Sequence, residues 1–338
     1  MLNKFSKPLA LAVLMASAVL IHGQTVTGSV ALPGLPEQVA VNPLTNRVYV
    51  AVPNFGALPY DYLTVIDGRT DTVITSVQIP PLAYAVAVDP VRNIVYVGGN
   101  FVDVNGVSQN EIVAVSGRTN NVITTISVST TPGNGIQGLA CNWRTGTLYA
   151  SNASDNEVDV IRHLAVVSRI AVSDIPYGVA VNSFLNLVYV ALLNGNVSII
   201  DGATRTITST TPFGASDVGI AVNPVTGNVF TTNQTATPPG SVGVLGSTGA
   251  VLSAVPVGNT PYGIDVDFRT NVVFVANSQD DTVSVIDGKT NTVTTTLPVS
   301  SLFLAANPRS GKVYVAPAAN TPTLAVISQD PPHHHHDD

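Results

Sequence analysis

Four short apolar segments, separated by polar turns, fill the stretch from Thr260 to Ser300. They are Tyr262–Asp267, Val272–Ala276, Thr282–Ile286 and Thr292–Leu297. The second segment is apolar without alternation, which predicts a strand buried on both faces. The fourth is mostly threonine, a β-branched residue that suits a half-exposed pleated surface. Helical periodicity is absent from Gln24 onward, so the stretch predicts a unit of four β-strands.

The same unit recurs along the chain, about seven times. Each first turn ends in a residue that enters the left-handed region at low cost, namely Asn46, Asn93, Gly146, Asn186, Gly227, Asn271 and Gly311. An aromatic residue follows three positions later, at Tyr49, Tyr96, Tyr149, Tyr189, Phe230, Phe274 and Tyr314. The repeats are spaced by 47, 53, 40, 41, 44 and 40 residues. This period is typical of a four-stranded propeller blade.

The last repeat is incomplete, because no fourth strand follows Thr323–Ile327. The segment Thr25–Leu32 matches Thr292–Val299 and is a spare fourth strand at the other end of the chain. Pairing the two ends in one blade removes the open edges of a linear array. The sequence therefore predicts an all-β, seven-bladed propeller of four-stranded antiparallel blades over residues 24–330, with the last blade closed by the N-terminal strand.

The blocks VYVAV, TVIDGRTDTV and VFVANSQDDTVSVIDGKTNTV resemble the YVTN-type β-propeller repeat family. That family is similar to the seven-bladed propellers of surface-layer proteins and of the methylamine dehydrogenase heavy chain. The resemblance spans Thr25 to Asp330 and implies a propeller whose role is binding or scaffolding. Blade 2 departs from it, since Gly98–Glu111 is similar to a related propeller repeat with a GGxF and NG signature.

Both ends of the chain lie outside the repeats. Residues 1–23 have a positive start and an apolar run over Pro8–Ile21, which predicts a signal peptide cleaved before Gln24 or after Ala18. The mature protein is then secreted, periplasmic or on the cell surface. Residues 331–338 form a His/Asp tail predicted to be disordered. Its histidines, His333, His334, His335 and His336, are candidate ligands for a divalent metal, and an end with only adventitious affinity is favoured over a functional site.

Composition narrows the classes of partner. Only 10% of residues are charged, and from Gln24 onward 12 Lys and Arg face 21 Asp and Glu. This acidic balance argues against nucleic acid as the main partner. Cys141 is the one cysteine, so no internal disulfide forms, and we interpret it as a small buried side chain. We expect a monomer with no membrane span after cleavage. Asn152, Asn196 and Asn233 begin N-x-[ST] sequons.

In a propeller, the loops joining strands 2 and 3 share one face with the links between blades. Here these loops vary most, so we call this the variable face and the opposite one the constant face. The longer loops are Pro53–Tyr62, Asn100–Asn110, Asn233–Gly240 and Pro317–Pro322. Loops carry function on rigid scaffolds, which predicts a binding surface on the variable face near blades 1 and 2. Neutral insertion is the alternative for any single loop.

The first strands line the central channel, and one of them carries a carboxylate. Their middle positions are Ala40, Ala87, Ala140, Ala180, Ala221, Asp265 and Ala305. Asp265 is either a ligand for a metal or polar molecule, or a structural carboxylate satisfied by backbone N–H groups. The structural alternative is favoured because buried polar groups are usually satisfied locally.

Three residues upstream, the predicted channel mouth is rich in tyrosine. Its ring reads Glu37, Tyr84, Gln137, Tyr177, Val218, Tyr262 and Leu302. Such a ring suits a small polar or aromatic ligand. The alternative is that each tyrosine belongs to a strand-entry turn and packs on its neighbour, as at Pro176–Gly178.

Residues for catalysis are scarce. His163 is the one histidine within the repeats, in a constant-face turn, and no G-x-S-x-G motif exists. Asp103, Asn105 and Glu111 miss the spacing of a calcium loop, so a plain turn is favoured over a weak calcium site. We expect a non-catalytic propeller without a cofactor that binds a protein, glycan or small ligand through its variable face. The alternatives are a lactonase- or lyase-like propeller enzyme using the mouth and Asp265, and a periplasmic metal-binding protein using the His tail.

Overall fold

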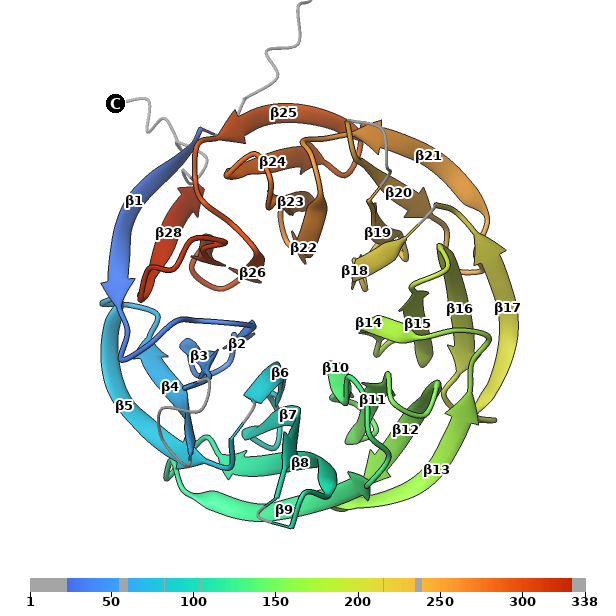
Figure 1. The fold of residues 1–338 in the computed structure, drawn as a ribbon. Coiled ribbons are helices and arrows are strands. Elements are labelled where there is room, and N and C mark those ends of the chain that lie inside the picture. The colour runs from blue at the N-terminus through green and yellow to red at the C-terminus, as the bar shows by residue number, and fades with distance from the viewer. Residues whose placement is uncertain are drawn as a thin grey trace, which may run out of the picture.

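A computed structural model shows a closed ring of seven β-sheets around a central channel (Figure 1). It describes residues 23–54, 60–81, 83–103, 105–214, 216–234 and 239–329. Within these ranges there is no helix, and each sheet has four antiparallel strands. The strands are consecutive in six sheets, and in the seventh the N-terminal strand joins the last three strands of the chain. The predicted seven-bladed propeller is therefore confirmed. Most of the predicted signal peptide and the His/Asp tail lie outside the described residues.

The strands of each blade are grouped here by their distance from the channel. The innermost strands are β2 (Val39–Asn42), β6 (Ala83–Asp89), β10 (Ile136–Asn142), β14 (Pro176–Asn182), β18 (Asp217–Val222), β22 (Pro261–Asp267) and β26 (Phe303–Asn307). The second strands are β3 (Arg47–Val52), β7 (Ile94–Val102), β11 (Thr147–Asn152), β15 (Leu187–Leu192), β19 (Val229–Asn233), β23 (Val272–Asn277) and β27 (Lys312–Ala316). The third strands are β4 (Asp61–Asp67), β8 (Ser108–Ser116), β12 (Glu157–Arg162), β16 (Asn196–Asp201), β20 (Ser241–Leu245), β24 (Thr282–Asp287) and β28 (Thr323–Gln329). The outermost strands are β5 (Thr72–Ile79), β9 (Val122–Ser129), β13 (Ala165–Ala171), β17 (Thr206–Pro212), β21 (Val251–Pro256), β25 (Thr292–Leu297) and β1 (Gln24–Ala31).

The two ends of the chain meet in the seventh blade, as predicted. Strand β1 pairs antiparallel with β28, from Gln24 opposite Gln329 to Ala31 opposite Thr323. Val30 is buried in the cluster that also holds Leu324, so the seam is packed as well as hydrogen-bonded. In Figure 1 the blue β1 lies outside the red β28.

The core consists of apolar layers between neighbouring blades. The middle strands are buried on both faces, which agrees with their unbroken apolar runs. The recurring aromatic residue of the second strand is buried in every blade. Tyr314 crosses the seam between blades 7 and 1, where its hydroxyl donates to Gly68 O at 3.2 Å and contacts Asp71 Oδ1 at 2.8 Å. These rings thus fix each blade against the next.

The constant face is held by a belt of side-chain amides that links the blades. Each innermost strand ends in a buried Asn or Asp whose Oδ1 accepts backbone N–H groups of the turn that follows. In four blades the Asn Nδ2 also donates to the left-handed Asn of the next blade. The pairs are Asn42 to Asn93 (2.9 Å), Asn142 to Asn186 (2.7 Å), Asn223 to Asn271 (2.6 Å) and Asn307 to Asn46 (2.7 Å). The left-handed Asn is therefore an acceptor as well as a turn residue.

Where the next blade has glycine at that turn, the belt changes. The blade after that of Asp89 has Gly146 at the turn, and the Asp89 carboxylate forms an ion pair with Arg92 at 2.9 Å instead. The blade after that of Asp267 has Gly311, and Asp267 accepts a hydrogen bond from Gln329 at 2.9 Å. The blade after that of Asn182 has Gly227 at the turn, and the buried Nδ2 of Asn182 has no hydrogen-bond partner. One of the seven junctions therefore keeps the donor of the belt and lacks its acceptor.

The residue that lies opposite this turn position, at the end of the third strand or just beyond it, follows the same division. It is Gly68, Gly117, Gly202 or Gly288 in the four blades with a left-handed Asn, where a Cβ would lie 2.3–2.9 Å from the Asn Oδ1. In the other three blades it is His163, Ser247 or Gln329. A side chain is accommodated here only where the turn residue is glycine.

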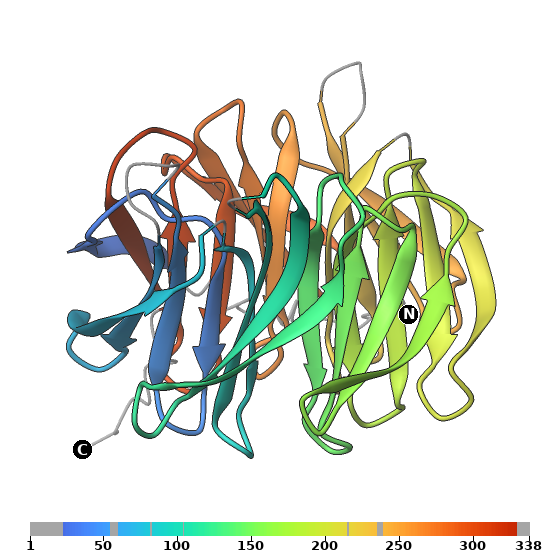
Figure 2. The ribbon, with the colours of Figure 1, turned by 60° about the horizontal axis from the view of Figure 1, so that its bottom comes forward.

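The variable face carries the more irregular connections, at the top of Figure 2. One predicted loop is largely wrong, because β7 and β8 extend through Asn100–Asn110 as a paired hairpin. Its turn covers residues 103–107, where Gly106 has φ +81°. The pairing of Phe101 with Gln109 continues the ladder beyond the blade, so this segment is a projecting ribbon.

Candidate binding site at the channel mouth

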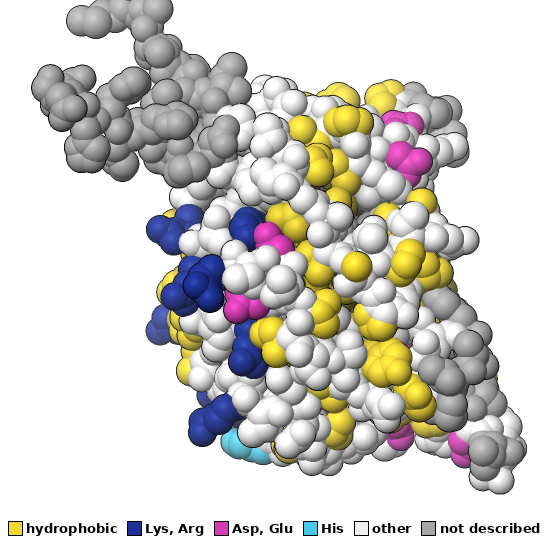
Figure 3. Space-filling view, turned by 90° about the vertical axis from the view of Figure 1, so that its left-hand side faces the viewer, with side chains coloured by type: hydrophobic (Ala, Val, Ile, Leu, Met, Phe, Trp, Pro, Cys, Tyr) yellow, Lys and Arg dark blue, Asp and Glu magenta, His cyan; other side chains and the backbone are white. Residues whose placement is uncertain are grey.

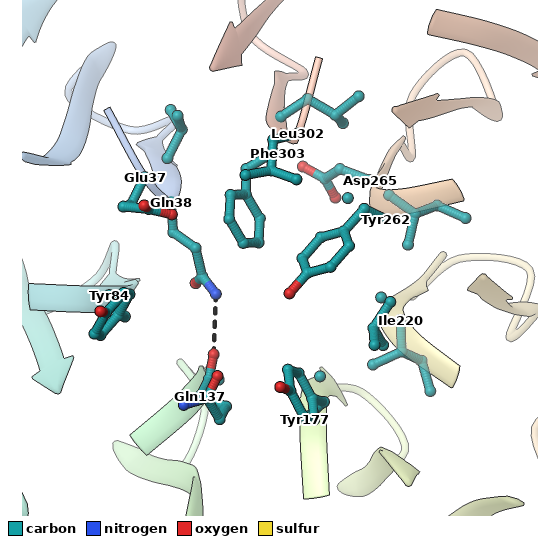
Figure 4. A pocket seen from close by; sticks show the side chains of 18 of the residues that line it. Glu37, Gln38, Tyr84, Gln137, Tyr177, Ile220, Tyr262, Asp265, Leu302 and Phe303 are labelled. Carbon is teal, nitrogen blue, oxygen red and sulfur yellow. Dashed lines mark hydrogen bonds between the residues drawn. The ribbon is translucent and has the colours of Figure 1, made fainter. Parts of the chain in front are cut away.

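A cavity of about 380 Å³ opens where the innermost strands begin, on the variable face (Figure 4). All seven blades contribute to its lining. The predicted site residues all line it, and they are Glu37, Tyr84, Gln137, Tyr177, Tyr262 and Asp265. Val218 and Leu302 complete the predicted ring. The structure thus brings together residues spread over more than 220 positions of the chain, and their role as ligand contacts stays a prediction.

A β-bulge places the mouth side chains. In five of the innermost strands the pairing register shifts across the mouth position, as between Ile136 and Gly138 or between Pro261 and Ile264. A bulge leaves one residue out of the ladder and re-aims its side chain. Figure 4 shows the Tyr262 ring directed toward the middle of the cavity. The tyrosines therefore line the mouth because the strand is interrupted at their position.

Glycines beside the bulges let neighbouring blades approach closely at the mouth. A Cβ on Gly138, Gly178 or Gly219 would lie 2.1–2.6 Å from a backbone oxygen of the next blade. At the next junction, Gly263 N donates to Leu302 O at 2.9 Å. Only glycine permits such an approach, so the rim of the cavity is a set of directly contacting backbones.

Two lining residues were missed by the sequence reasoning. Gln38 reaches across the channel, where its Nε2 donates to Gln137 O at 3.0 Å (Figure 4). Phe303 meets Tyr262 edge to face, with ring centroids 5.2 Å apart. Gln38 and Phe303 occupy equivalent positions, two residues before Ala40 and Ala305. At this position the other five blades have alanine or glycine. That contrast in size is the signal that identifies them.

The site is rich in hydrogen-bonding groups and has no basic side chain. Burial raises the pKa of Glu37 and raises the pKa of Tyr262 to about 12, with Tyr177 and Glu37 adding to the latter effect. Burial, followed by the charge of Glu37, also raises the pKa of Tyr84. Tyr84 and Tyr262 are therefore neutral donors near pH 7. Because no Lys, Arg or His lines the cavity, an anionic ligand has no counter-charge there.

Asp265 is bonded on both oxygens by backbone. Its Oδ1 accepts Val266 N–H at 2.8 Å, and its Oδ2 accepts Ala306 N–H at 2.9 Å in the next blade. Burial raises its pKa to about 6, and the two hydrogen bonds oppose that shift. This arrangement fits the structural alternative, because the carboxylate joins β22 to β26.

The other candidate residues are not assembled into a site. Asp103 accepts the N–H groups of Asn105 and Val107, both at 2.9 Å, which is the geometry of a plain turn. No group of three or more His, Cys, Asp or Glu within the described residues is placed to hold a metal ion. His163 lies exposed in its turn on the constant face. The His tail and any metal bound there fall outside the described residues.

Two smaller predictions can be examined in the same way. Burial, followed by the charge of Asp89, raises the pKa of the Cys141 thiol, which keeps it protonated and unreactive. The sequon residue Asn152 is fully buried, and its Nδ2 donates to Asp155 (2.8 Å) and Asp159 (3.1 Å). A glycan has no access to Asn152 in the folded chain. Among the described residues no helix is long and apolar enough to span a membrane.

Comparison with known proteins supports the fold. No protein-family model matches the chain. A curated protein, PE-PGRS family protein PE_PGRS18 of Mycobacterium tuberculosis (strain ATCC 25618 / H37Rv), is 38% identical over 154 residues. The match covers 34% of this chain and 34% of that protein, so the chain spans about a third of that relative. Among solved structures, the Kuenenia stuttgartiensis hydrazine synthase is similar with a TM-score of 0.70 at 17% identity, over 88% of this chain and 96% of that one. This chain is thus similar to known propellers in fold, and its chemistry must be argued from its own residues.

Proposed function

We propose that the chain is an exported, non-catalytic binding module of the YVTN repeat type that takes a small ligand at its channel mouth. The observation that carries the proposal is the enclosed cavity of about 380 Å³ with aromatic and polar walls. Ligand sites are concave, mostly apolar and fitted with a few convergent polar groups. Phe303, Tyr177 and Tyr262 supply the aromatic surface, and Glu37, Gln38 and Gln137 supply the polar groups.

The charges of the lining select the class of ligand. Glu37 lies beside three tyrosines and no basic group, which favours a neutral polyol or a small organic cation over a carboxylate or phosphate. A cation gains from the aromatic faces as well as from the Glu37 carboxylate. The volume of the cavity limits the ligand to a small molecule, and a longer glycan would enter with one end only.

An enzyme alternative has little support in this geometry. A lactonase- or lyase-like reaction needs a cluster of acids or bases at the mouth. Both oxygens of Asp265 already accept backbone N–H groups, which leaves Glu37 as the one other carboxyl group of the lining. A scaffold role, in which a protein partner covers the variable face, would use the same surface. A screen for small ligands distinguishes the two roles.

The test is a ligand-observed NMR screen of small cations, polyols and small carboxylates against the chain from Gln24. We expect cations or polyols to bind, and Tyr262→Ala to abolish that binding. Phe184→Ser, on the constant face, is the matched control that removes an aromatic ring and leaves binding intact. Carboxylates as the sole binders, or equal binding by both variants, would overturn the proposal.

A further inference from the structure

Basic side chains are concentrated on the constant face. Among the described residues, every Lys and Arg except Arg169 lies in a turn or at a strand end there. They are Arg47, Arg69, Arg92, Arg118, Arg144, Arg162, Arg205, Arg269, Lys289, Arg309 and Lys312. Figure 3 shows Lys and Arg gathered toward one end of the side view. A chain whose net charge is −7 therefore presents one basic surface.

Acidic side chains on that face are fewer and largely committed. Asp67, Asp201 and Asp287 each accept backbone N–H groups of their own turn, and Asp89 and Asp267 are buried. Asp71 forms an ion pair with Lys312 at 2.7 Å. The variable face holds most of the other carboxylates, namely Glu37, Asp61, Asp103, Asp155, Glu157, Asp174, Asp280 and Asp281. The two faces thus differ in the sign of their charge.

The same face exposes apolar side chains at the tips of its inner turns. The second residue after the buried Asn or Asp of each inner turn is apolar in four blades and arginine in three. These tips are Leu44, Val91, Arg144, Phe184, Val225, Arg269 and Arg309. Val225 is 71% exposed and Phe184 is 54% exposed. On the variable face, Val107 is the single exposed large apolar side chain among the described residues, and it is 43% exposed.

The tips are held in place by contacts between blades. Trp143 packs edge to face on Phe184 with centroids 5.6 Å apart, and the Arg144 guanidinium lies over both rings at 5.7 and 5.4 Å. Arg309 donates to Leu44 O at 2.6 Å across the seam between blades 7 and 1. The inner turns are of equal length in all seven blades, so their tips extend equally far beyond the sheets. The surface is therefore a rigid, nearly flat ring.

We propose that the constant face docks on the surface of an anionic lipid bilayer. Apolar tips such as Phe184 and Val225 enter the headgroup region, and the arginines and lysines around them contact lipid phosphates. Surfaces that bind membrane interfaces combine Trp, Phe and Leu with Lys and Arg. Anionic lipid also attracts each basic residue near the surface. A flat ring fits a flat surface, whereas nucleic acid offers no place for exposed apolar tips. The channel mouth then faces away from the membrane.

The test is co-sedimentation of the chain from Gln24 with vesicles of phosphatidylcholine alone and of phosphatidylcholine mixed with phosphatidylglycerol. We expect binding to the mixed vesicles, weakened by added salt. Arg118→Gln should lower the apparent affinity about fivefold, and Arg118→Gln with Lys289→Gln about 25-fold.

Val225→Glu tests the apolar tips, and Val107→Glu is its matched control on the variable face. We expect the first to abolish binding and the second to leave it unchanged. Phe184→Glu repeats the test in a neighbouring blade, and a thermal unfolding curve confirms that each variant is folded. Equal binding to both vesicles, equal loss in the two valine variants, or salt-sensitive self-association in place of vesicle binding would overturn the proposal.

Discussion

The unpartnered amide of Asn182 predicts a stabilising pair of substitutions. In four junctions the equivalent Nδ2 donates to a left-handed Asn of the next blade at 2.6–2.9 Å. In this one the next blade has Gly227, with φ +79°, and the donor is buried without a partner. Gly227→Asn supplies the missing acceptor in a conformation that Asn adopts in four other blades.

The single substitution should fail because of Ser247. In the four blades with a left-handed Asn, a Cβ after the third strand would lie 2.3–2.9 Å from the Asn oxygen, and glycine stands there. Blade 5 has Ser247 at that position. Ser247→Gly must therefore accompany Gly227→Asn. The Tyr189 hydroxyl, which bonds Ser247 O at 3.0 Å, keeps its partner because the backbone is unchanged.

The expected gain in the free energy of unfolding follows from the Asn182 Nδ2 donor, which gains a hydrogen-bond partner. Leaving a buried donor unsatisfied costs about 1–3 kcal/mol. Losing a glycine at position 227 restricts the unfolded chain by about 0.4–1 kcal/mol, and the left-handed φ of +79° offsets that gain. Gaining a glycine at position 247 costs about 0.5–1 kcal/mol, so the net gain is smaller than the value of the hydrogen bond. We expect the double variant to unfold with a free energy about 1–2 kcal/mol higher than that of the parent protein.

The assay is urea denaturation of the parent, both single variants and the double variant. The double-mutant cycle should give a favourable coupling energy of about 1–3 kcal/mol. Asn271→Gly is the reciprocal change, because it removes the acceptor of Asn223 and should cost a similar amount. The reasoning is refuted if Gly227→Asn alone gives the whole gain, or if the two changes are additive.

Three further predictions concern the seam, the rim and the channel. Val30→Ala, in the buried part of β1, should cost about 2 kcal/mol, whereas Val26→Ala, exposed in the same strand, should change stability by less than about 0.5 kcal/mol; equal urea midpoints would argue against a packed seam. Gly219→Ala should cost about 3 kcal/mol or more, since its Cβ would lie 2.1 Å from Tyr262 O, while Gly28→Ala, with no atom within 4 Å, should stay within about 1 kcal/mol. The raised pKa of Asp265, about 6, means that the folded state holds this proton more tightly than the unfolded chain. Its contribution, about 3 kcal/mol at most, is therefore full below about pH 4 and lost as pH rises through about 6. Asp265→Ala should flatten the stability curve over that range in denaturation experiments, and an unchanged curve would assign the dependence elsewhere.

The repeat made the architecture predictable. Positions such as Asn46 and Tyr49 recur at fixed offsets because every blade needs a left-handed turn and a large ring between sheets. The match of Thr25–Leu32 to another fourth strand identified the seam, since an unpaired edge strand needs a partner. Five candidate residues of the mouth ring, and Asp265 three positions further along its strand, were found from the same alignment, because equivalent positions of a closed ring share one height.

What the sequence left undetermined depends on single residues and on the comparison of faces. A bulge adds one residue to a short apolar strand, and neither the length nor the polarity of β10 records it. The length of the hairpin in blade 2 was misjudged because Asn100 and Asn110 are polar. Both nevertheless pair within the ribbon, where Asn110 is buried and accepts from Asn100 Nδ2 at 2.7 Å. The net charge of the chain does not reveal the basic face, because it sums the charges of both faces. Its residues become a surface only when each turn is assigned to a face.

The pairing of Gln24 with Gln329 also decides how the molecule is best handled. Both chain ends leave the ring beside the short turns, on the side away from the cavity. A tag at either end, immobilised on a sensor chip, will present the open mouth to the flowing analyte and shield the arginine-rich side. The same molecule attached through a cysteine introduced in the blade 2 ribbon will be inverted. Two such chips compare the two surfaces at the cost of one substituted residue, which lies in the ribbon.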